Sequence, residues 1–537
     1  MRTSFLLSAL LTLVVNATAQ SSRGLELKVA SGSAVSGPLS GLDVIPDGRD
    51  GLAVIKTPFT AYFLFIPIRK GQVTIDTFHG PKLRKGKTIT LPRAAEKAWT
   101  QTRMNADDVR TLNVFAERKR LRFERFVVDR GTQRFRKEPL GSFAQPAKKH
   151  RMYMMHTRMS PSGTYTMVLS RNVVHEKLMG VQVTVLDSLF TVKESWYVPM
   201  PFPLVKYRFD MPAIDEAGHV TASLRGIPRE KGRPKKFRSF VVHGGPGPLA
   251  IEEVVLGDMD AICAAAFVAE DGTPVVNGLA WDQATDRIGI FTQRMDGTIP
   301  ASGGAEFLDL PEAEIDKLLF SAKDFKLADR DIKLDEEDEE KDDLRERFRL
   351  LRSLVPIRLD RLPDGDHEMI AEVRQDDVFC TDINRSSSCT PTFLRGNLLH
   401  IRLAPDGTVK YFGTVSKLYR SILTDVMGGL IALYDGDTMR LLFNEYALAN
   451  RVGREQDMGS GGQEATDRMK DSEVVTSCYT FVPGYEPVRE HVPELSKKGN
   501  WLFPEIQVRY GPAAVISTLN SRSGGRFVRL EVSGADR

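Results

Sequence analysis

Short runs in which apolar residues alternate with polar ones recur along most of the chain. Val181–Leu186 (VQVTVL) alternates in this way, and Tyr165–Leu169 and Phe190–Val192 follow the same pattern. A period of two residues is typical of a strand with one face buried. Further runs rich in Val, Ile, Phe and Thr continue to the C-terminus. The pattern therefore predicts half-buried β-strands over most of the chain.

Polar segments centred on glycine separate these runs and predict hairpin turns. Examples are AIDEAGHV, AEDGTPVV and LAPDGTVKY, and the glycines at the centres of such segments are Gly218, Gly272, Gly297, Gly365 and Gly407. Glycine suits tight turns because it adopts positive φ without steric cost. Asn277-Gly278 is expected to form a further turn of the Asn-Gly type.

The many predicted hairpins and few long helical patterns indicate an all-β protein. Groups of about four strands every ~45–60 residues fit the blades of a β-propeller, which closes on itself and so hides its edges. We expect about six to eight blades. A string of β-sandwiches is the alternative, and a solenoid is disfavoured because the turns are unevenly spaced.

Residues 310–354 interrupt the strand pattern. Pro311 followed by Glu312, Glu314 and apolar residues predicts a short helix. Eight of the nine residues in 335–343 are acidic, and we expect a solvated excursion between blades there. The run lacks the spacing of a calcium loop, and whether it binds cations stays open.

The first residues resemble a signal peptide. Met1-Arg2 is followed by the apolar run Phe5–Val15 and by small residues at Ala17 and Ala19. Cleavage is expected after Ala19, which places the mature protein in the periplasm or outside the cell. No later apolar run approaches the ~20 residues that span a membrane. The expected organisation is a signal peptide at 1–19, a β-rich segment at 20–108, blades at 109–309, the insertion at 310–354 and further blades at 355–537.

Export changes the interpretation of the four cysteines. Cys380 and Cys389 bracket the polar loop TDINRSSS, and we expect them to form a disulfide at a hairpin tip. Cys263 lies in the apolar run AICAAAFV and is expected to be a buried thiol. A zinc site made from all four cysteines is disfavoured because the chain has no C-x-x-C pair. No metal or cofactor is expected.

The net charge of the chain gives no indication of a nucleic-acid partner. The net charge is +4 over 537 residues, too small a bias to imply nucleic acid. Two basic clusters, at residues 118–125 and 229–238, are expected to be a polar strand edge and a solvated loop. In an exported protein such clusters suggest acidic glycans or lipid headgroups at most.

His243-Gly244-Gly245-Pro246-Gly247 resembles the oxyanion-hole motif of proline iminopeptidases, which are α/β-hydrolases. That motif works with a serine on a G-x-S-x-G elbow, and the chain contains none; MGSGG around Ser460 fails at its first position. We therefore expect HGGPG to connect two antiparallel strands, at 237–242 and 249–256. The nine histidines form no metal-binding spacing, and the sequence identifies no catalytic residue.

Several segments together resemble a known group of proteins. They are Thr184–Trp196 followed by Ile214–Val220, Asp364-Gly365 with Met369–Glu372, Asn397–Lys417, and Phe443-Asn444 with Glu445. In this order they are similar to uncharacterised, exported β-propeller-like proteins of bacteria, from about Val109 to the C-terminus. His400-Ile401-Arg402 and Tyr411 depart from that pattern. The resemblance implies a fold and export but no activity.

Two functions follow from these expectations. The first is an exported β-propeller that binds a protein or glycan ligand, or acts as a scaffold, without catalysis. The alternative is an exported hydrolase that acts on glycans, with carboxylates from several blades near the central channel. A pocket with two facing, desolvated carboxylates favours the enzyme, and a solvated mouth without them favours binding.

Overall fold

The computed structural model describes most residues from 25 to 532, with longer gaps at 30–41, 230–237, 297–305, 326–352 and 447–473 and shorter ones elsewhere. The expected signal peptide, the acidic run 335–343, Gly297, Ser460 and most of the basic loop lie outside the described residues.

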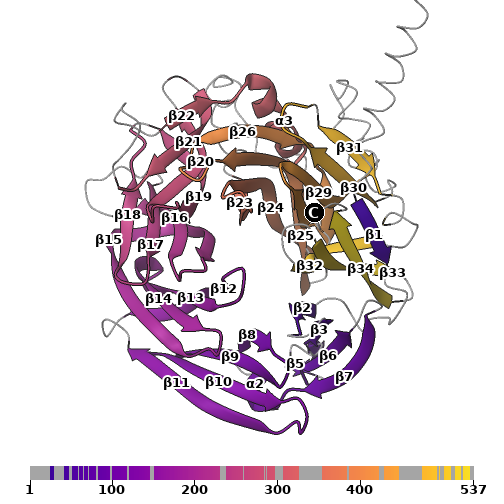
Figure 1. Ribbon diagram of the computed structural model, residues 1–537. Coiled ribbons are helices and arrows are strands. Elements are labelled where there is room, and N and C mark those ends of the chain that lie inside the picture. The colour runs from indigo at the N-terminus through magenta and orange to yellow at the C-terminus, as the bar shows by residue number, and fades with distance from the viewer. Residues whose placement is uncertain are drawn as a thin grey trace, which may run out of the picture.

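Almost all of the described chain forms antiparallel β-strands (Figure 1). The first sheet contains β2 (Leu42–Pro46), β3 (Gly51–Lys56), β6 (Thr74–His79) and β7 (Arg84–Thr90), beside the hairpin of β4 (Thr60–Phe63) and β5 (Ile66–Arg69). The second contains β8 (Trp99–Met104), β9 (Asp108–Glu117), β10 (Arg120–Asp129) and β11 (Phe135–Ala144). The third has seven strands, which are β12 (Arg151–Met159), β13 (Tyr165–Val174), β14 (Lys177–Asp187), β15 (Val192–Ile214), β16 (Val220–Pro228), β17 (Arg238–Gly244) and β18 (Leu249–Val254).

Four further sheets complete the described chain. One contains β19 (Asp260–Val268), β20 (Pro274–Asp282), β21 (Arg287–Arg294) and β22 (Glu306–Asp309). The next contains β23 (Leu354–Arg361), β24 (His367–Ile383), β25 (Ser386–Leu403), β26 (Val409–Val415) and β27 (Tyr419–Ile422). The last two contain β28 (Leu430–Asp435), β29 (Thr438–Tyr446), β30 (Val474–Phe481) and β31 (Val488–His491), then β32 (Trp501–Arg509), β33 (Ala514–Ser521), β34 (Gly524–Val532) and β1 (Leu25–Val29).

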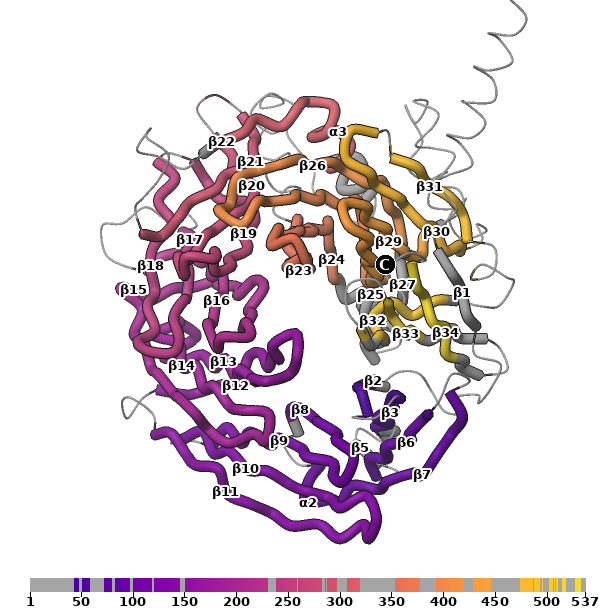
Figure 2. Tube along the Cα trace, in the orientation of Figure 1, coloured from indigo at the N-terminus to yellow at the C-terminus, as the bar shows by residue number. Residues whose placement is uncertain are grey.

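The sheets follow one another around a ring in chain order (Figure 2). The first strand of a sheet, such as β2, β8 or β23, lies toward the centre, and a later strand, such as β7, β11 or β22, lies at the outside. Radial antiparallel sheets around a centre define the β-propeller fold. The prediction of an all-β propeller is thereby confirmed at the level of the fold.

The two ends of the described chain meet in one sheet. β1 pairs with β34 in the register Leu25↔Val532 to Val29↔Val528, and it is the outermost strand of the sheet β1-β34-β33-β32. In Figure 1 the indigo β1 accordingly lies beside the yellow strands. This pairing joins the first and the last described strands in one sheet, as in propellers whose ring is closed by strands from both ends of the chain.

Local glycine signals predicted most hairpin turns correctly. Gly218, Gly272, Gly365 and Gly407 all have positive φ and lie between antiparallel strands. In the β19–β20 turn the Gly272 N–H donates to Ala269 O at 3.0 Å, and the Ala269 N–H donates to Thr273 O at 2.8 Å. The turn residue fixes the hairpin because glycine alone adopts this conformation without strain.

The expected turn at Asn277-Gly278 is wrong, since both residues lie inside β20. Asn277 is buried, and its Nδ2 donates to Phe291 O at 3.0 Å and Thr292 Oγ1 at 2.8 Å. A Cβ on Gly278 would lie 2.0 Å from Cys263 O of the neighbouring strand. Glycine here permits close approach of β19, and tertiary packing overrides the local turn preference.

The strand at Val181–Leu186 is confirmed within β14, but it is buried on both faces. Val183 and Val185 belong to the core within its own sheet, while Leu186 packs with Phe123 of the preceding sheet. The polar Thr184 is also buried, and its hydroxyl hydrogen-bonds Ser195 Oγ at 2.9 Å. Stacking between two neighbouring sheets explains why alternation did not produce a solvated face.

The described helices are short, and one confirms a prediction. α3 (Glu312–Phe325) begins directly after Pro311, and its Ile315 and Leu318 are buried in a core cluster with Leu399. α2 (Arg93–Glu96) is a single turn. Within the described residues neither helix is long and apolar enough to cross a membrane. The expected boundary between residues 108 and 109 falls within β9.

Candidate binding site

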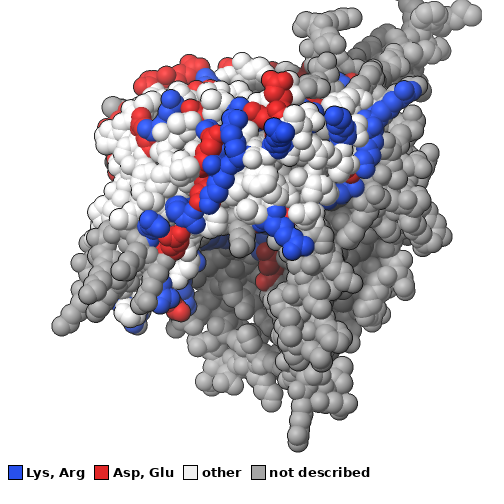
Figure 3. Space-filling model, turned by 90° about the horizontal axis from the view of Figure 1, so that it is seen from below, with Lys and Arg blue, Asp and Glu red and all other residues white. Residues whose placement is uncertain are grey.

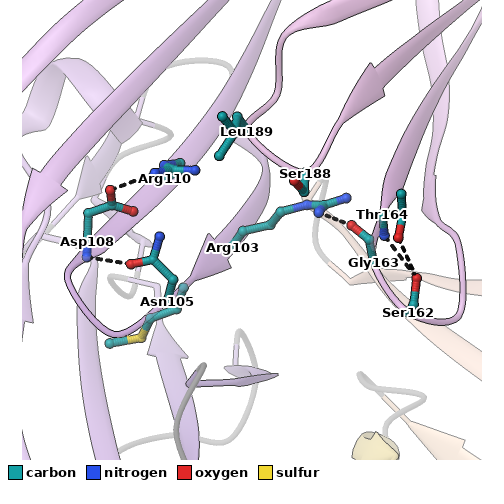
Figure 4. A pocket seen from close by; sticks show the side chains of 10 residues that line it. Arg103, Asn105, Asp108, Arg110, Ser162, Gly163, Thr164, Ser188 and Leu189 are labelled. Atoms are coloured by element: carbon teal, nitrogen blue, oxygen red, sulfur yellow. Dashed lines mark hydrogen bonds and ion pairs between the residues drawn. The ribbon is translucent and has the colours of Figure 1, made fainter.

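Two pockets lie between neighbouring sheets, one on each side of the turn that joins β8 to β9. We call the first the Arg103 pocket; it has a volume of about 280 Å³ and is shown in Figure 4. Its lining residues come from the second and third sheets and are Arg103, Met104, Asn105, Asp108, Arg110, Ser162, Gly163, Thr164, Ser188 and Leu189. Residues far apart in the chain are thus brought together by the contact between two sheets.

Arg103 joins the two sheets that form this pocket. It lies near the end of β8, and its Nη1 donates to Gly163 O in the β12–β13 turn. Its Nη2 donates to Tyr165 O at 3.0 Å and to Thr166 Oγ1 at 2.6 Å. These acceptors are all neutral. Burial lowers the pKa of Arg103 to about 10, so its guanidinium stays protonated at neutral pH.

The β8–β9 turn holds the opposite wall in place. Asn105 Oδ1 accepts hydrogen bonds from the N–H groups of Asp107 and Asp108, each at 2.8 Å. Asp108 Oδ2 accepts a hydrogen bond from Arg110 Nη2 at 2.8 Å (Figure 4). An Asx turn of this kind fixes the loop before any ligand arrives.

Hydroxyl groups from two hairpin turns face the arginines. Ser162 and Thr164 lie in the β12–β13 turn, and their hydroxyls are 2.7 Å apart. Ser188 is exposed in the β14–β15 turn. The Arg103 pocket therefore presents guanidinium, amide and hydroxyl groups, which donate and accept hydrogen bonds in the manner that a hydroxyl-rich ligand requires.

The second pocket, which we call the His79 pocket, has a volume of about 470 Å³ and lies between the first and second sheets. His79 Nδ1 is 2.8 Å from the buried Asp47 Oδ2. Two exposed carboxylates, Asp107 and Asp129, line it. Hydrogen bonds from Thr132 lower the pKa of Asp129, so it cannot supply a proton near neutral pH.

Neither described pocket has the carboxylate pair that glycoside hydrolysis requires. The Arg103 pocket has one lining carboxylate, Asp108, and Arg110 is bound to it. In the His79 pocket both carboxylates are exposed to solvent. A general acid needs a raised pKa, whereas the pKa of Asp129 is lowered.

HGGPG is a hairpin connection, as predicted. β17 and β18 pair from Ser239↔Val254 to Gly244↔Leu249. The N–H of Gly247 donates to Glu194 Oε2 at 3.3 Å, and His243 Nε2 lies 2.9 Å from Glu252 Oε1. This backbone donor and this imidazole therefore have carboxylate partners and do not face a serine nucleophile.

We expect His243→Ala to leave folding and ligand binding nearly unchanged. Gly245→Val is expected to destabilise the protein by about 1–3 kcal/mol through backbone strain. Gly245 has φ of 116°, and a Cβ there would lie 2.5 Å from Gly218 O. Thermal unfolding of both variants checks this. Equal unfolding temperatures for the two variants would contradict the assignment of a strained turn.

The cysteines divide into two pairs of different character. Cys263 and Cys478 are buried free thiols, and burial raises the pKa of each to about 11. The prediction of a buried, unpaired Cys263 is confirmed. Cys380 and Cys389 are directly opposite in the backbone register of β24 and β25. Their side chains lie outside the described residues.

The basic cluster at 118–125 is largely neutralised by acidic neighbours. Arg120 and Arg122 both pair with Glu117, at 2.6 and 2.8 Å, and Arg125 pairs with Glu138. Figure 3 shows the same alternation, with basic and acidic side chains side by side on the face seen from below. The polar strand edge expected from the sequence fits these contacts, and no extended positive patch arises from these three arginines.

The residues that carry the resemblance lie in buried polar networks. Lys417 Nζ contacts Glu372 Oε1, and the Lys417 N–H donates to Asn397 Oδ1 at 2.8 Å. Asn444 Nδ2 donates to Leu502 O of the next sheet at 2.7 Å. The neighbouring Glu445 is buried and bound by Arg489. The Asn444 contact joins two sheets, the other contacts lie within one sheet, and none of these side chains lines either described pocket.

The sequence did not identify the pocket residues. Arg103, Ser162 and Ser188 belong to no motif, and they meet only because two sheets pack together. The single local signal is that Ser162 and Ser188 lie in hairpin turns. Among the described residues, no group of three or more His, Cys, Asp or Glu side chains is arranged to hold a metal ion.

No family model matches the chain, and no curated protein matches it. Similar solved structures include the β-propeller domain of the Trilobed protease from Pyrococcus furiosus, with 10% identity, 72% of this chain and 98% of that chain covered and a TM-score of 0.30. Polysaccharide lyase Uly1 has 9% identity, 83% and 92% coverage and a TM-score of 0.29. The Nup133 β-propeller domain of Vanderwaltozyma polyspora has 7% identity, 81% and 100% coverage and a TM-score of 0.28. Because these scores are low, the fold assignment rests on the strand order and ring of this structure.

Proposed function

We propose that this protein is an exported β-propeller that binds a glycan in the Arg103 pocket and does not cleave it. The observation that carries the proposal is the lining of this pocket. It includes two arginines, an asparagine, three hydroxyl groups and one ion-paired carboxylate. Such groups form the directional hydrogen bonds that sugar hydroxyls require.

The size of the pocket favours a sugar over a protein segment. Its volume of about 280 Å³ is just below the range of about 300–1,000 Å³ typical of pockets for drug-sized molecules. This space suits one sugar ring. Both walls are fixed by internal hydrogen bonds, those of Asn105 on one side and of Ser162 with Thr164 on the other, so little ordering cost accompanies binding.

Hydrolysis is the alternative function, and the His79 pocket is where it would be tested. Asp107 and Asp129 line that pocket together. If the protein were a hydrolase that used them, Asp129→Asn would abolish glycan cleavage. The lowered pKa of Asp129 keeps this carboxyl group ionised across the neutral range, which suits a base or nucleophile and excludes the role of general acid.

The ring is proposed to have eight blades. β15 pairs with β14 through Val192–Pro199 and with β16 through Leu204–Ile214. The seven-stranded sheet then divides into two four-stranded blades that share β15, and these two blades with the other six large sheets make eight.

Export is proposed to allow a disulfide between Cys380 and Cys389. Opposite residues in antiparallel strands have Cα atoms about 4.5–5.5 Å apart, which suits a disulfide. We expect the exported protein to contain this bond, and Cys380→Ser to lower its stability by about 2–3 kcal/mol. Peptide mapping without reductant checks the bond, with Cys263→Ala as a variant that leaves it intact. Alkylation of Cys380 in the native, unreduced protein would contradict it.

A panel of oligosaccharides, assayed by calorimetry and product analysis, tests the proposed function. We expect binding of at least one glycan, no cleavage products, and loss of binding in Ser188→Trp, which fills the pocket. Ala217→Trp is the matched control, since Ala217 is exposed in another hairpin turn and lines neither described pocket. Glycan cleavage that Asp129→Asn abolishes, or equal binding by both tryptophan variants, would contradict the proposal.

A further inference from the structure

We infer that the Arg103 pocket selects acidic sugars and binds their carboxylate between Arg103 and Arg110. This inference rests on the proposed function, because it names the class of glycan that the same pocket takes. A carboxylate and a guanidinium form charge-assisted hydrogen bonds, which are shorter and stronger than those between neutral groups.

Among the described residues, no carboxylate lies at ion-pair distance from the partly buried Arg103, and the negative charge of Asp187 offsets only part of the lowering of its pKa by burial. Its three hydrogen bonds go to Gly163 O, Tyr165 O and Thr166 Oγ1. Its Nε–H is buried and has no acceptor among the described residues. A cation removed from water is stabilised by an anion far better than by neutral oxygens. The charge of Arg103 is therefore incompletely compensated.

Three carboxylates near the pocket have partners other than Arg103. Asp108 is bound to Arg110 at 2.8 Å. Asp187 Oδ1 accepts the N–H groups of its own turn, from Leu189 at 2.9 Å and Thr191 at 2.8 Å. Glu216, from the β15–β16 turn, accepts hydrogen bonds from Ser162. Asp187 and Glu216 are not among the lining residues, and the charged groups that line the pocket itself are two arginines and one carboxylate.

Another buried arginine shows how the same fold compensates such a charge internally. Arg402 has only 2% of its side chain exposed, and it contacts three carboxylates, Asp364, Asp366 and Asp437. Arg103 has neutral oxygens where Arg402 has anions. The carboxylate that Arg103 lacks is the one that an acidic sugar brings, and Ser188 and Thr164 remain to bind the sugar hydroxyls.

The test compares two oligosaccharides that differ only in charge. The probes are a pentamer of galacturonic acid and the neutral pentamer obtained by reducing its carboxyl groups, each titrated calorimetrically into the full exported protein. We expect the acidic pentamer to bind at least tenfold more tightly, and its affinity to fall as salt is raised. Arg103→Met is expected to remove this preference, and its unfolding temperature shows whether it still folds.

A second variant tests the charge without removing a contact to the neighbouring sheet. Asp108→Asn removes the lining carboxylate and is expected to strengthen binding of the acidic pentamer several-fold more than binding of the neutral one. Arg136→Gln, at an exposed arginine of β11 outside the described pockets, is the control that should change neither affinity. Equal affinity for the two pentamers would overturn the charge selection and leave glycan binding intact. Failure of both to bind, or a preference unaffected by Arg103→Met and Asp108→Asn, would also overturn it, and the wider oligosaccharide panel decides glycan binding separately.

Discussion

Lys417→Met is expected to lower the free energy of unfolding by about 3–5 kcal/mol, the range for breaking one partner out of a buried ion pair. The side chains of Lys417 and Glu372 both have 0% exposure. Lys417 Nζ also donates to Gly428 O at 2.6 Å. Methionine fills a similar volume but leaves the Glu372 carboxylate with one cation, the partly exposed Arg374 at 2.5 Å.

The pH dependence of this loss gives a second readout. Burial alone would raise the pKa of Glu372, but the charges of Lys417 and Arg374 outweigh it and hold that pKa below its ordinary value. The ionised Glu372 therefore stabilises the folded protein above its unfolded pKa, and this contribution disappears as pH falls through the folded pKa. In Lys417→Met the pKa of Glu372 should rise, so the difference from the parent protein should shrink as pH is lowered.

Urea unfolding at neutral and mildly acidic pH measures both effects. Lys317→Met is the matched control, because Lys317 is 53% exposed and pairs with Glu314 on the surface of α3. Exposed pairs contribute about 0–1 kcal/mol, so the control should lose little. A loss of unfolding free energy below about 1 kcal/mol for Lys417→Met would show that the buried Lys417–Glu372 ion pair does not stabilise the fold.

A chain that begins at residue 30 is expected to lose on the order of 3–5 kcal/mol of stability. It lacks β1, whose five paired positions run from Leu25↔Val532 to Val29↔Val528. Backbone hydrogen bonds contribute roughly 0.5–1.5 kcal/mol each to stability. Removal also makes the nine-residue β34 the open edge of this sheet in place of the five-residue β1, and a longer open edge invites association with other chains. Calorimetry and light scattering should show an unfolding temperature lower by roughly 5 °C or more, and self-association.

A peptide of residues 20–35 provides the control for this deletion. It should restore the unfolding temperature of the shortened chain by adding a strand along β34. The same peptide with Leu27→Pro should fail, because proline cannot donate to the ladder. Unchanged stability of the shortened chain would contradict closure of the ring by β1.

The sequence predicted what depends on local geometry and missed what depends on contacts between sheets. Gly272 and Gly365 marked turns correctly because the positive φ of glycine is a local requirement. Asn277-Gly278 carries the same local signal, yet the approach of Cys263 O places it inside a strand. The pairing of β1 with β34 joins the two ends of the described chain, and no local sequence pattern predicts it.

The sequence could not predict the candidate site, because that site also depends on a contact between two sheets. Arg103 and Ser188 are far apart in the chain and meet at the contact of two sheets. HGGPG, the most conspicuous motif, was correctly interpreted as a hairpin because the chain has no elbow serine. Glu372 and Lys417 carried a resemblance, but only the structure shows that they are buried against each other.

A crystal structure of the protein soaked with the galacturonic acid pentamer tests the central claim most directly. The account predicts an intact sugar in the Arg103 pocket, with its carboxylate between Arg103 and Arg110 and its hydroxyls against Ser188 and Thr164. A cleaved sugar, or a sugar bound in the His79 pocket beside Asp107 and Asp129, would contradict the account and favour a hydrolase.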